Sequence, residues 1–134
     1  MGMNQHVKWG ILGTGKIAND FASALSSVDG ASIHTVASRD LGRSRNFAQR
    51  WQASTSFAGY QEAISQSEVD VFYVATPNEV HEEHVRMCLA SGRAVLCEKP
   101  FTVNAELARS LTTEATEMGV FCMEALWTRF VPAI

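Results

Sequence analysis

The sequence predicts the α/β fold class, with a doubly wound and mostly parallel sheet, on three observations. Short β-prone segments alternate with amphipathic helical segments almost without exception along the chain. The segment Val69–Ala75 is apolar at nearly every position, which is typical of a strand that helices cover on both faces. The first strand-like segment ends at a glycine-rich turn. Because crossovers between parallel strands are right-handed, this alternation predicts helices on both faces of the sheet.

The predicted elements follow from apolar spacing and from the residues that start or stop each segment. Asp40 is a typical helix N-cap, and Gly119 is a typical helix terminator. We expect strands at Val7–Leu12, Ser32–Ala37, Ser56–Ala58, Val69–Ala75, Ala94–Cys97 and Val120–Met123. We expect helices from Ile17 to about Ser27, after Asp40 through Trp51, at Tyr60–Ser65, through Val85 and Leu89 to Gly92, and from about Asn104 to Met118. The Met and Phe residues fall at buried-face spacings, which predicts that they fill the core.

Length, charge and cysteine content exclude several classes of protein. A chain of 134 residues corresponds to one domain. A net charge of −3 and an isoelectric point near 5.8 argue against a nucleic-acid or membrane-surface partner. No apolar segment approaches the ~20 residues of a membrane span. Cys88, Cys97 and Cys122 form no C-x-x-C pair, so we expect reduced thiols, as in a cytoplasmic protein.

The glycine-rich turn predicts a dinucleotide site. Residues 13–18 read Gly-Thr-Gly-Lys-Ile-Ala, which is G-x-G-x-x-A between a strand and a helix. Gly13 permits the tight turn, Gly15 lets a pyrophosphate approach the backbone, and Ala18 lets the helix pack closely on the strand. Amide groups at the helix start stabilise the anion. We therefore expect a Rossmann-type fold in which the turn contacts the cofactor, Thr14, Lys16 and Ile17 included.

A competing phosphate motif overlaps this turn. Residues 10–16 also read G-x-x-x-x-G-K, the start of a P-loop, but Ile17 stands where the magnesium-binding Ser or Thr would follow. The intervening Ile11 and Leu12 belong to an apolar strand end rather than to a polar loop. The sequence thus favours a dinucleotide over a nucleoside triphosphate.

The end of the second strand bears on which dinucleotide is bound. NAD-binding proteins of this type place a carboxylate there, and an arginine accommodates the 2′-phosphate of NADP. Here Ser38 and Arg39 follow the strand, Arg43 lies one turn further on, and Asp40 suits a helix cap. A guanidinium beside a hydroxyl favours NADP, with NAD as the alternative if Arg39 is merely solvated.

Five motifs together resemble the Gfo/Idh/MocA oxidoreductases. In that order they are the glycine turn, Ala-Ser-Arg-Asp at 37–40, Thr-Pro-Asn at 76–78 with His81, Glu-Lys-Pro at 98–100, and Glu-Ala-Leu-Trp-Thr-Arg-Phe at 124–130. The last motif looks most like the branch of dimeric dihydrodiol and D-xylose dehydrogenases. The resemblance covers essentially the whole chain and implies hydride transfer between a nicotinamide and a carbinol of a sugar or cyclic diol.

The resemblance also implies a role for each motif. It places the catalytic role on Lys99, whose cation would stabilise the charge of the reacting oxygen and join a proton relay. It places the remaining motif residues at the cofactor: Thr76, Pro77, Asn78, His81, Glu98, Trp127 and Arg129. For Trp127, a core or interdomain anchor is an open alternative.

A possible zinc motif at residues 81–84 does not fit the known spacing. His-Glu-Glu-His places two histidines three residues apart, whereas the metalloprotease motif H-E-x-x-H places them four apart. No third ligand accompanies them, so we expect no metal and read Glu82 and Glu83 as acidic residues at a helix start.

The resemblance implies a second domain that this chain does not contain. We assign residues 1–124 to the dinucleotide-binding domain and 125–134 to the start of the connection to a substrate and dimerisation domain. In the family that second domain supplies an acid or base side chain and forms the dimer, so we expect a homo-oligomer. The alternative is a free-standing dinucleotide-sensing module without catalysis. The residues that would select the substrate are expected in the second domain, so this sequence does not identify the substrate.

Overall fold

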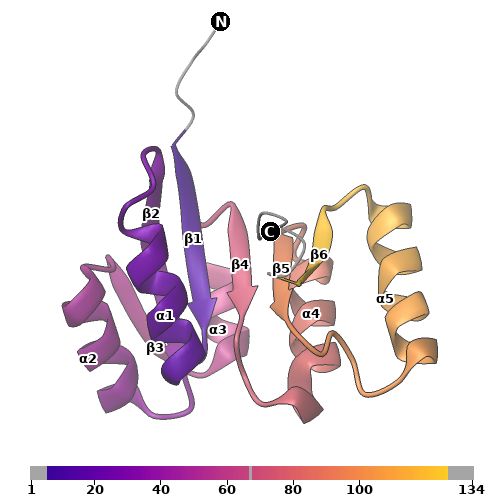
Figure 1. Ribbon diagram of the computed structural model, residues 1–134, viewed down its shortest axis with the longest axis horizontal. Coiled ribbons are helices and arrows are strands. Elements are labelled where there is room, and N and C mark those ends of the chain that lie inside the picture. The colour runs from indigo at the N-terminus through magenta and orange to yellow at the C-terminus, as the bar shows by residue number, and fades with distance from the viewer. Residues whose placement is uncertain (1–5, 67, 127–134) are drawn as a thin grey trace, which may run out of the picture.

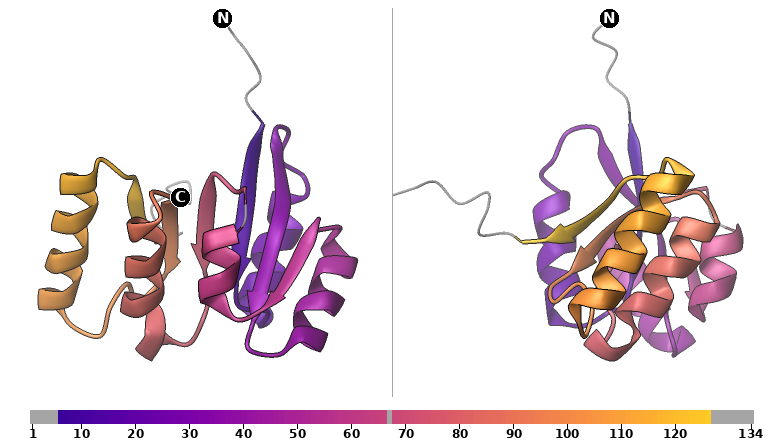
Figure 2. Two further views of the ribbon diagram at one scale, coloured as in Figure 1. Left: turned by 180° about the vertical axis from the view of Figure 1, so that it is seen from behind. Right: turned by 90° about the vertical axis from the view of Figure 1, so that its right-hand side faces the viewer.

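A computed structural model describes residues 6–66 and 68–126, which form a six-stranded sheet with helices on both faces (Figures 1 and 2). The strands are β1 (Val7–Leu12), β2 (Ala31–Ser38), β3 (Thr55–Ala58), β4 (Val71–Val74), β5 (Ala94–Glu98) and β6 (Cys122–Ala125). The helices are α1 (Lys16–Leu25), α2 (Leu41–Trp51), α3 (Tyr60–Gln66), α4 (His81–Ala90) and α5 (Ala105–Met118), with a 3-10 turn at Asn78–Val80.

The sheet order is β3-β2-β1-β4-β5-β6, and every neighbouring pair is parallel. From β1 the chain first winds outwards to β3, then returns to pair β4 with the other edge of β1 and winds outwards again to β6. The predicted doubly wound parallel sheet is confirmed. It also fixes the switch point between β1 and β4, where ligands of such sheets bind.

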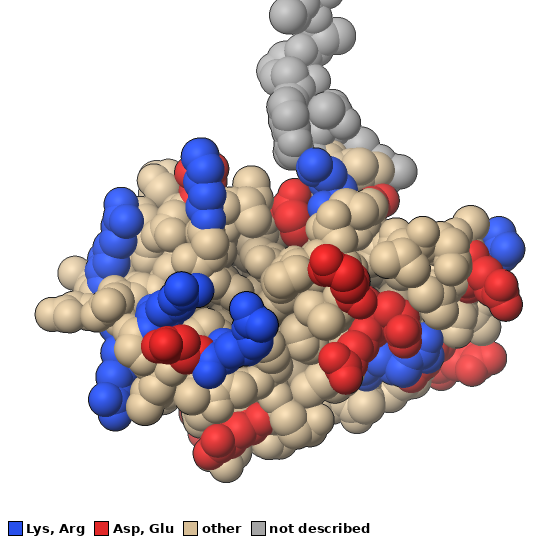
Figure 3. Space-filling model, turned by 90° about the horizontal axis from the view of Figure 1, so that it is seen from below, with Lys and Arg blue, Asp and Glu red and all other residues tan. Residues whose placement is uncertain are grey.

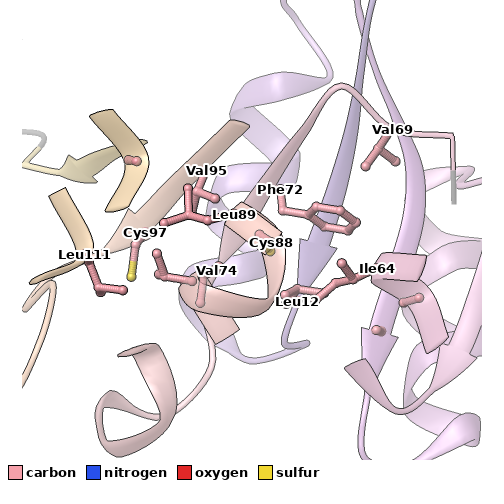
Figure 4. Close-up of a cluster of buried hydrophobic side chains, with 14 of the residues drawn as sticks. Leu12, Ile64, Val69, Phe72, Val74, Cys88, Leu89, Val95, Cys97 and Leu111 are labelled. Atoms are coloured by element: carbon pink, nitrogen blue, oxygen red, sulfur yellow. The ribbon is translucent and has the colours of Figure 1, made fainter. Parts of the chain in front are cut away.

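Two hydrophobic clusters cover the two faces of the sheet. One joins α3, α4 and α5 to the sheet and includes Phe72, Val95 and Leu111 (Figure 4). The other lies under α1 and α2 and includes Ile11 and Tyr73. Since Phe72 and Tyr73 are neighbours in β4 and both are buried, this strand is covered on both faces, as its apolar sequence predicts.

Two helix ends agree with the capping residues expected from the sequence, Asp40 and Gly119, and Asn104 caps a further helix. The Asp40 carboxylate accepts the backbone N–H of Arg43 at 3.0 Å at the start of α2. The Asn104 side chain accepts the N–H of Leu107 at 2.9 Å at the start of α5. Gly119 ends α5 in the left-handed conformation. Each contact satisfies an amide or carbonyl that the helix itself leaves unpaired.

The last strand and part of the predicted core differ from the sequence-based expectation. β6 begins at Cys122 rather than Val120, because the N–H of Val120 donates to Ala115 O at 2.9 Å and closes α5. Phe121 is 62% exposed and Met118 is 44% exposed, so the prediction that all Met and Phe residues fill the core is wrong for these two. Both lie where α5 turns into β6, and a buried-face spacing does not extend across such a turn.

Cys88, Cys97 and Cys122 all carry free thiols. Burial raises the pKa of Cys88 and Cys97 well above the ordinary thiol value, and burial alone raises that of Cys122 to about 11. These thiols therefore stay protonated at neutral pH and contribute as small apolar groups. No helix within residues 6–66 and 68–126 has the length and apolar character that crossing a membrane requires.

Candidate functional site

The motifs singled out in the sequence all follow strands, and the parallel sheet brings them to one edge. Gly13–Gly15 follows β1, Ser38–Asp40 follows or ends β2, Thr76–Asn78 follows β4, and Glu98–Pro100 ends β5. Figure 3 shows this edge, with Lys and Arg side chains gathered over the part that α1 and α2 occupy and acidic side chains towards α4 and α5. The edge is therefore polarised between a basic and an acidic half.

Gly13 lies at the contact between the turn after β1 and the end of β4. Its φ is +107°, and a Cβ built there would lie 2.5 Å from Ala75 O. The N–H of Ala75 in turn donates to Leu12 O at 2.8 Å, and that of Gly13 donates to Ala37 O at 2.8 Å. Both the conformation and the space require glycine at this position.

Gly15 differs from Gly13, because neither its backbone conformation nor the space around it requires glycine. It is the N-cap of α1 with φ −82°, a conformation open to any residue, and a Cβ built on it would meet nothing within 4 Å. No side chain caps α1, so its first amides face open space. Nothing in the described fold requires glycine here, and the vacant space before uncapped amides has the form of an anion cradle.

A pocket of about 320 Å³ connects this cradle to the end of β2. Its lining includes Gly13, Thr14, Gly15, Ser38, Arg39, Asp40, Arg43, Tyr60, Ala75, Thr76 and Pro77. The ion pairs within the described residues involve Lys16 and Arg86, which leaves the exposed guanidinium groups of Arg39 and Arg43 without an acidic partner there. Burial raises the pKa of Tyr60, and the nearby Arg39 cation partly opposes this effect.

Ser38 lines this pocket but its hydroxyl is already engaged. It donates to Asp40 O at 2.6 Å and lies 2.7 Å from the Oγ of Ser44, which donates to Phe57 O. The side chain is buried and braces the turn into α2. Ser38, Arg39 and Arg43 all line the pocket, and the Ser38 hydroxyl also holds the turn into α2.

A second pocket of about 390 Å³ lies between the start of α1 and the length of α2, and it shares Thr14, Gly15 and Arg43 with the first. It is lined by Thr14, Gly15, Asn19, Arg43, Asn46, Phe47 and Arg50. Together the two pockets extend the positive surface from the glycine turn along α2. Such a surface suits a ligand with more than one phosphate.

On the other side of α1 the chain forms an apolar pocket of about 310 Å³. Its lining is Ile17, Asp20, Phe21, Tyr73, Leu96, Glu98 and Ala125. The rings of Phe21 and Tyr73 stack at 3.9 Å, and the Tyr73 hydroxyl donates to Glu98 Oε2 at 2.6 Å. Burial and the Glu98 carboxylate both raise the pKa of Tyr73, so it remains a donor. Sequence reasoning missed this Tyr73–Glu98 pair, because Tyr73 stands inside an apolar strand.

Lys16 lies on the exposed surface of α1 and forms an ion pair with Asp20 at 3.0 Å. Lys99 is exposed, follows the last paired residue of β5 and precedes Pro100 through a cis peptide bond. Among the residues that the structure describes, the Lys99 ammonium has no hydrogen-bond or ion-pair partner. Trp127 and Arg129, which the sequence also assigns to the site, lie outside the described residues.

The two histidines of α4 form hydrogen bonds with the loops at the strand ends. His84 Nδ1 lies 2.8 Å from Thr76 Oγ1. His81 is 0% exposed, with Nε2 at 2.8 Å from Thr76 O and Nδ1 at 2.8 Å from Pro100 O. The structure thus places His81 behind the strand-end loops and not on the surface where a cofactor would lie. Residues 6–66 and 68–126 contain no group of His, Cys, Asp and Glu that could hold a metal ion.

His84 makes stability depend on pH. Burial lowers its pKa below the ordinary 6.5, the charge of His81 adds to that effect, and Glu83 opposes it. The unfolded chain therefore binds this proton at a higher pH than the folded one, so stability is retained above pH 6.5 and falls as the pH drops below it. We expect the Tm of His84→Gln to fall less than that of the unmodified chain between pH 7 and pH 5. His34→Gln, on the distant strand β2, is the control, and equal pH slopes for all three proteins would contradict the prediction.

The comparisons with known proteins agree with this geometry. Residues 7–126 match the family described as "Oxidoreductase family, NAD-binding Rossmann fold". The chain is 44% identical over 130 residues to trans-1,2-dihydrobenzene-1,2-diol dehydrogenase of Mus musculus, covering 96% of this chain and 39% of that protein. Identity to the Homo sapiens protein of the same name is 40% over 129 residues, with coverages of 95% and 39%. The chain therefore spans about two fifths of the length of these relatives.

Solved structures show the same arrangement. A 3-ketoreductase from Actinomadura kijaniata in complex with NADP superposes with a TM-score of 0.91 at 29% identity, covering 96% of this chain and 41% of that one. An NAD binding oxidoreductase from Klebsiella pneumoniae gives a TM-score of 0.89 at 25% identity, with coverages of 96% and 36%. This chain belongs to the Gfo/Idh/MocA oxidoreductase family, and its residues 7–126 match the NAD-binding Rossmann fold of that family.

Proposed function

We propose that this chain is the NADP-binding half of an oxidoreductase that transfers a hydride between the cofactor and a carbinol of a sugar or cyclic diol. One observation carries the choice of NADP over NAD: Arg39 and Arg43 line the pocket at the end of β2 without an acidic partner among the described residues. Asp40 is the carboxylate nearest in sequence, and it caps α2 instead. The named activities of the relatives, a dihydrodiol dehydrogenase and a 3-ketoreductase, support the substrate class.

The residues present fit this cofactor. The uncapped amides of α1, with the vacant space at Gly15, would hold the pyrophosphate. Arg39 and Arg43 would hold a 2′-phosphate, and the apolar pocket beside Ile17 would receive the nicotinamide. Bound there, NADP supplies the hydride acceptor, and NADPH supplies the hydride. We assign Thr14, Lys16, Thr76, Pro77, Asn78 and Glu98 to the rim of this site, with Trp127 and Arg129 as further members.

Lys99 is the proposed catalytic residue. Its exposed ammonium lies at the carboxyl edge of the sheet, beside the Glu98 that lines the apolar pocket. From there it can donate a hydrogen bond to the reacting oxygen and stabilise the negative charge that develops as that oxygen loses its proton. We propose that residues 1–124 form the dinucleotide-binding domain and that residues 125–134 begin the connection to a substrate domain. We further propose a cytoplasmic homo-oligomer, from the family resemblance and the free thiols.

A titration tests the cofactor assignment directly. NADPH, NADH and ATP are added separately to the chain, and binding is followed by quenching of tryptophan fluorescence. We expect NADPH to bind most tightly, NADH more weakly, and ATP weakly at best. Tight, magnesium-dependent ATP binding would instead indicate a P-loop protein, and failure of both nicotinamide dinucleotides to bind the full-length gene product would refute the proposal.

Arg39→Asp is expected to reverse the preference between the two dinucleotides. Losing a charge-assisted contact and adding a carboxylate should weaken NADPH binding by about 10- to 100-fold while NADH binding is unchanged or tighter. The measurement is the ratio of the two dissociation constants. Arg45→Asp makes the same charge change on α2 at a residue that does not line the pocket, and it should leave the ratio unaltered. An unchanged ratio in Arg39→Asp would refute the role of Arg39.

A further inference from the structure

The peptide group between Pro100 and Phe101 is bonded at both ends by side chains from other elements. Its carbonyl oxygen lies 2.8 Å from His81 Nδ1, at the start of α4. Its N–H donates to Glu124 Oε2 at 2.8 Å, from β6. One peptide group is therefore clamped between an imidazole and a carboxylate. The flanking residues are separated from these partners by 19 and 23 positions in the chain.

The clamp extends through His81 to a second loop. The other ring nitrogen, Nε2, lies 2.8 Å from Thr76 O, at the end of β4. Carbonyl oxygens only accept hydrogen bonds, so a ring with an N–H on each nitrogen donates to both loops, and a neutral ring donates to only one. The ring is 0% exposed, and its contact with Thr76 O is buried. His81 thereby ties the loop after β4 to the turn after β5.

This peptide group lies immediately beyond Lys99, at a point where the sheet no longer fixes the chain. The last register pair between β5 and β6 is Glu98 with Ala125. Lys99 comes after it, and its side chain contacts no described partner that would orient it. The direction in which Lys99 leaves the sheet is thus determined by the turn that follows, which the clamp holds together with the buried side chain of Phe101.

We propose that Glu124 and His81 are positioning residues, which hold the turn after β5 so that Lys99 is aimed at the reacting oxygen. This proposal takes the hydride-transfer reaction from the proposed function. The positioning role itself is argued from the geometry of the clamp. Both side chains act through their contacts with the backbone rather than by contact with the reacting groups in this proposal. A misplacement of the order of 1 Å at a catalytic group lowers a rate about 100-fold, so loss of one clamp contact should slow hydride transfer by about 10- to 100-fold.

Two Glu124 variants separate the hydrogen bond from mere packing. Glu124→Ala removes the acceptor for the Phe101 N–H, whereas Glu124→Gln keeps a side-chain carbonyl oxygen that can accept it. Asp70→Ala is the matched control, because the Asp70 carboxylate accepts the Lys8 N–H at the same 2.8 Å at the opposite edge of the sheet. His81→Asn tests the other end of the clamp. If His81→Asn does not fold, because the residue is buried, the comparison of Glu124→Ala with Glu124→Gln still tests the positioning role.

Three quantities are measured in the full-length gene product. They are the single-turnover rate of NADP reduction by trans-1,2-dihydrobenzene-1,2-diol, the dissociation constant of NADPH, and the exchange rate of the Phe101 amide by NMR. We expect Glu124→Ala to slow the rate by about 10- to 100-fold, with the dissociation constant changed by less than about threefold. Its Phe101 amide should exchange at least about 10 times faster, since it loses its acceptor. Glu124→Gln should restore most of the hydride-transfer rate and most of the protection of the Phe101 amide. Asp70→Ala should lower the Tm without changing the rate or the amide exchange.

The outcomes distinguish the two proposals. If the unmodified protein binds no NADPH or does not oxidise the diol, the proposed function fails for this substrate class, and the positioning role fails with it. Phe101 exchange that is unaltered in Glu124→Ala shows that the clamp does not exist, whatever the activity. A Glu124→Ala enzyme with rapid Phe101 exchange but an unchanged rate overturns the positioning role and leaves the proposed function intact.

Discussion

Lys99→Ala is expected to lower the rate of hydride transfer in the full-length gene product by about 100- to 1,000-fold, the typical effect of removing a group that stabilises charge on a reacting oxygen. The dissociation constant of NADPH should change by less than about threefold, since the sites proposed for the pyrophosphate and the 2′-phosphate lie at α1 and α2, away from β5. The variant should also keep its Tm, because the Lys99 side chain is exposed and makes no contact that supports the fold.

The measurement is a single-turnover rate together with a separate cofactor titration. Lys8→Ala is the matched control, because Lys8 lies in β1 near the amino edge of the sheet, away from the proposed site. It should leave both quantities unchanged. A Lys99→Ala enzyme that keeps the normal rate would remove Lys99 from the mechanism. One that loses NADPH binding in parallel with the rate would assign Lys99 to cofactor binding instead.

The sequence predicts the fold and the cofactor half of the site because their signals are local. A strand that ends at Gly13, a helix that begins after Gly15, and a cap at Asp40 each depend on neighbours within a few residues. The parallel sheet then brings all strand ends to one edge as a matter of topology. For this reason the glycine turn and Arg39, placed from sequence, line the same pocket in the structure.

The contacts that the sequence does not reveal join residues far apart in the chain. Glu124 contacts the Phe101 amide, and the Tyr73 hydroxyl contacts Glu98, across 23 and 25 positions. Periodicity and capping patterns carry no information about such pairs. His81 is the instructive case: its motif places it with the cofactor residues, yet both ring nitrogens lie against backbone carbonyls. A residue can belong to a functional motif because it shapes the loops of the site.

The other large expected effect concerns the two glycines of the turn. Substitution of Gly13 should lower stability, and substitution of Gly15 should lower cofactor affinity. Gly13→Ala should lower the free energy of unfolding by about 2–5 kcal/mol, since an L-residue is disfavoured at a φ of +107° and its Cβ would overlap Ala75 O at 2.5 Å. The obstacle is the backbone of Ala75, directly after β4, which a rotamer change does not relieve. Gly15→Ala should lower the free energy of unfolding by no more than about 1 kcal/mol, since its Cβ meets open space and the only cost is that of alanine at a helix N-cap.

For binding, Gly15→Ala should be the more revealing variant. A methyl group in the vacant space before α1 occupies the position proposed for the pyrophosphate, so NADPH affinity should fall by about 10- to 100-fold in a chain that is otherwise folded. Urea unfolding and NADPH titration of the two variants give all four quantities. If Gly15→Ala binds NADPH as tightly as the unmodified chain, the pyrophosphate does not lie on the α1 amides, and the vacant space at that residue needs another explanation. If instead it loses affinity while Gly13→Ala loses stability, each glycine serves one purpose, the first for the sheet and the second for the ligand.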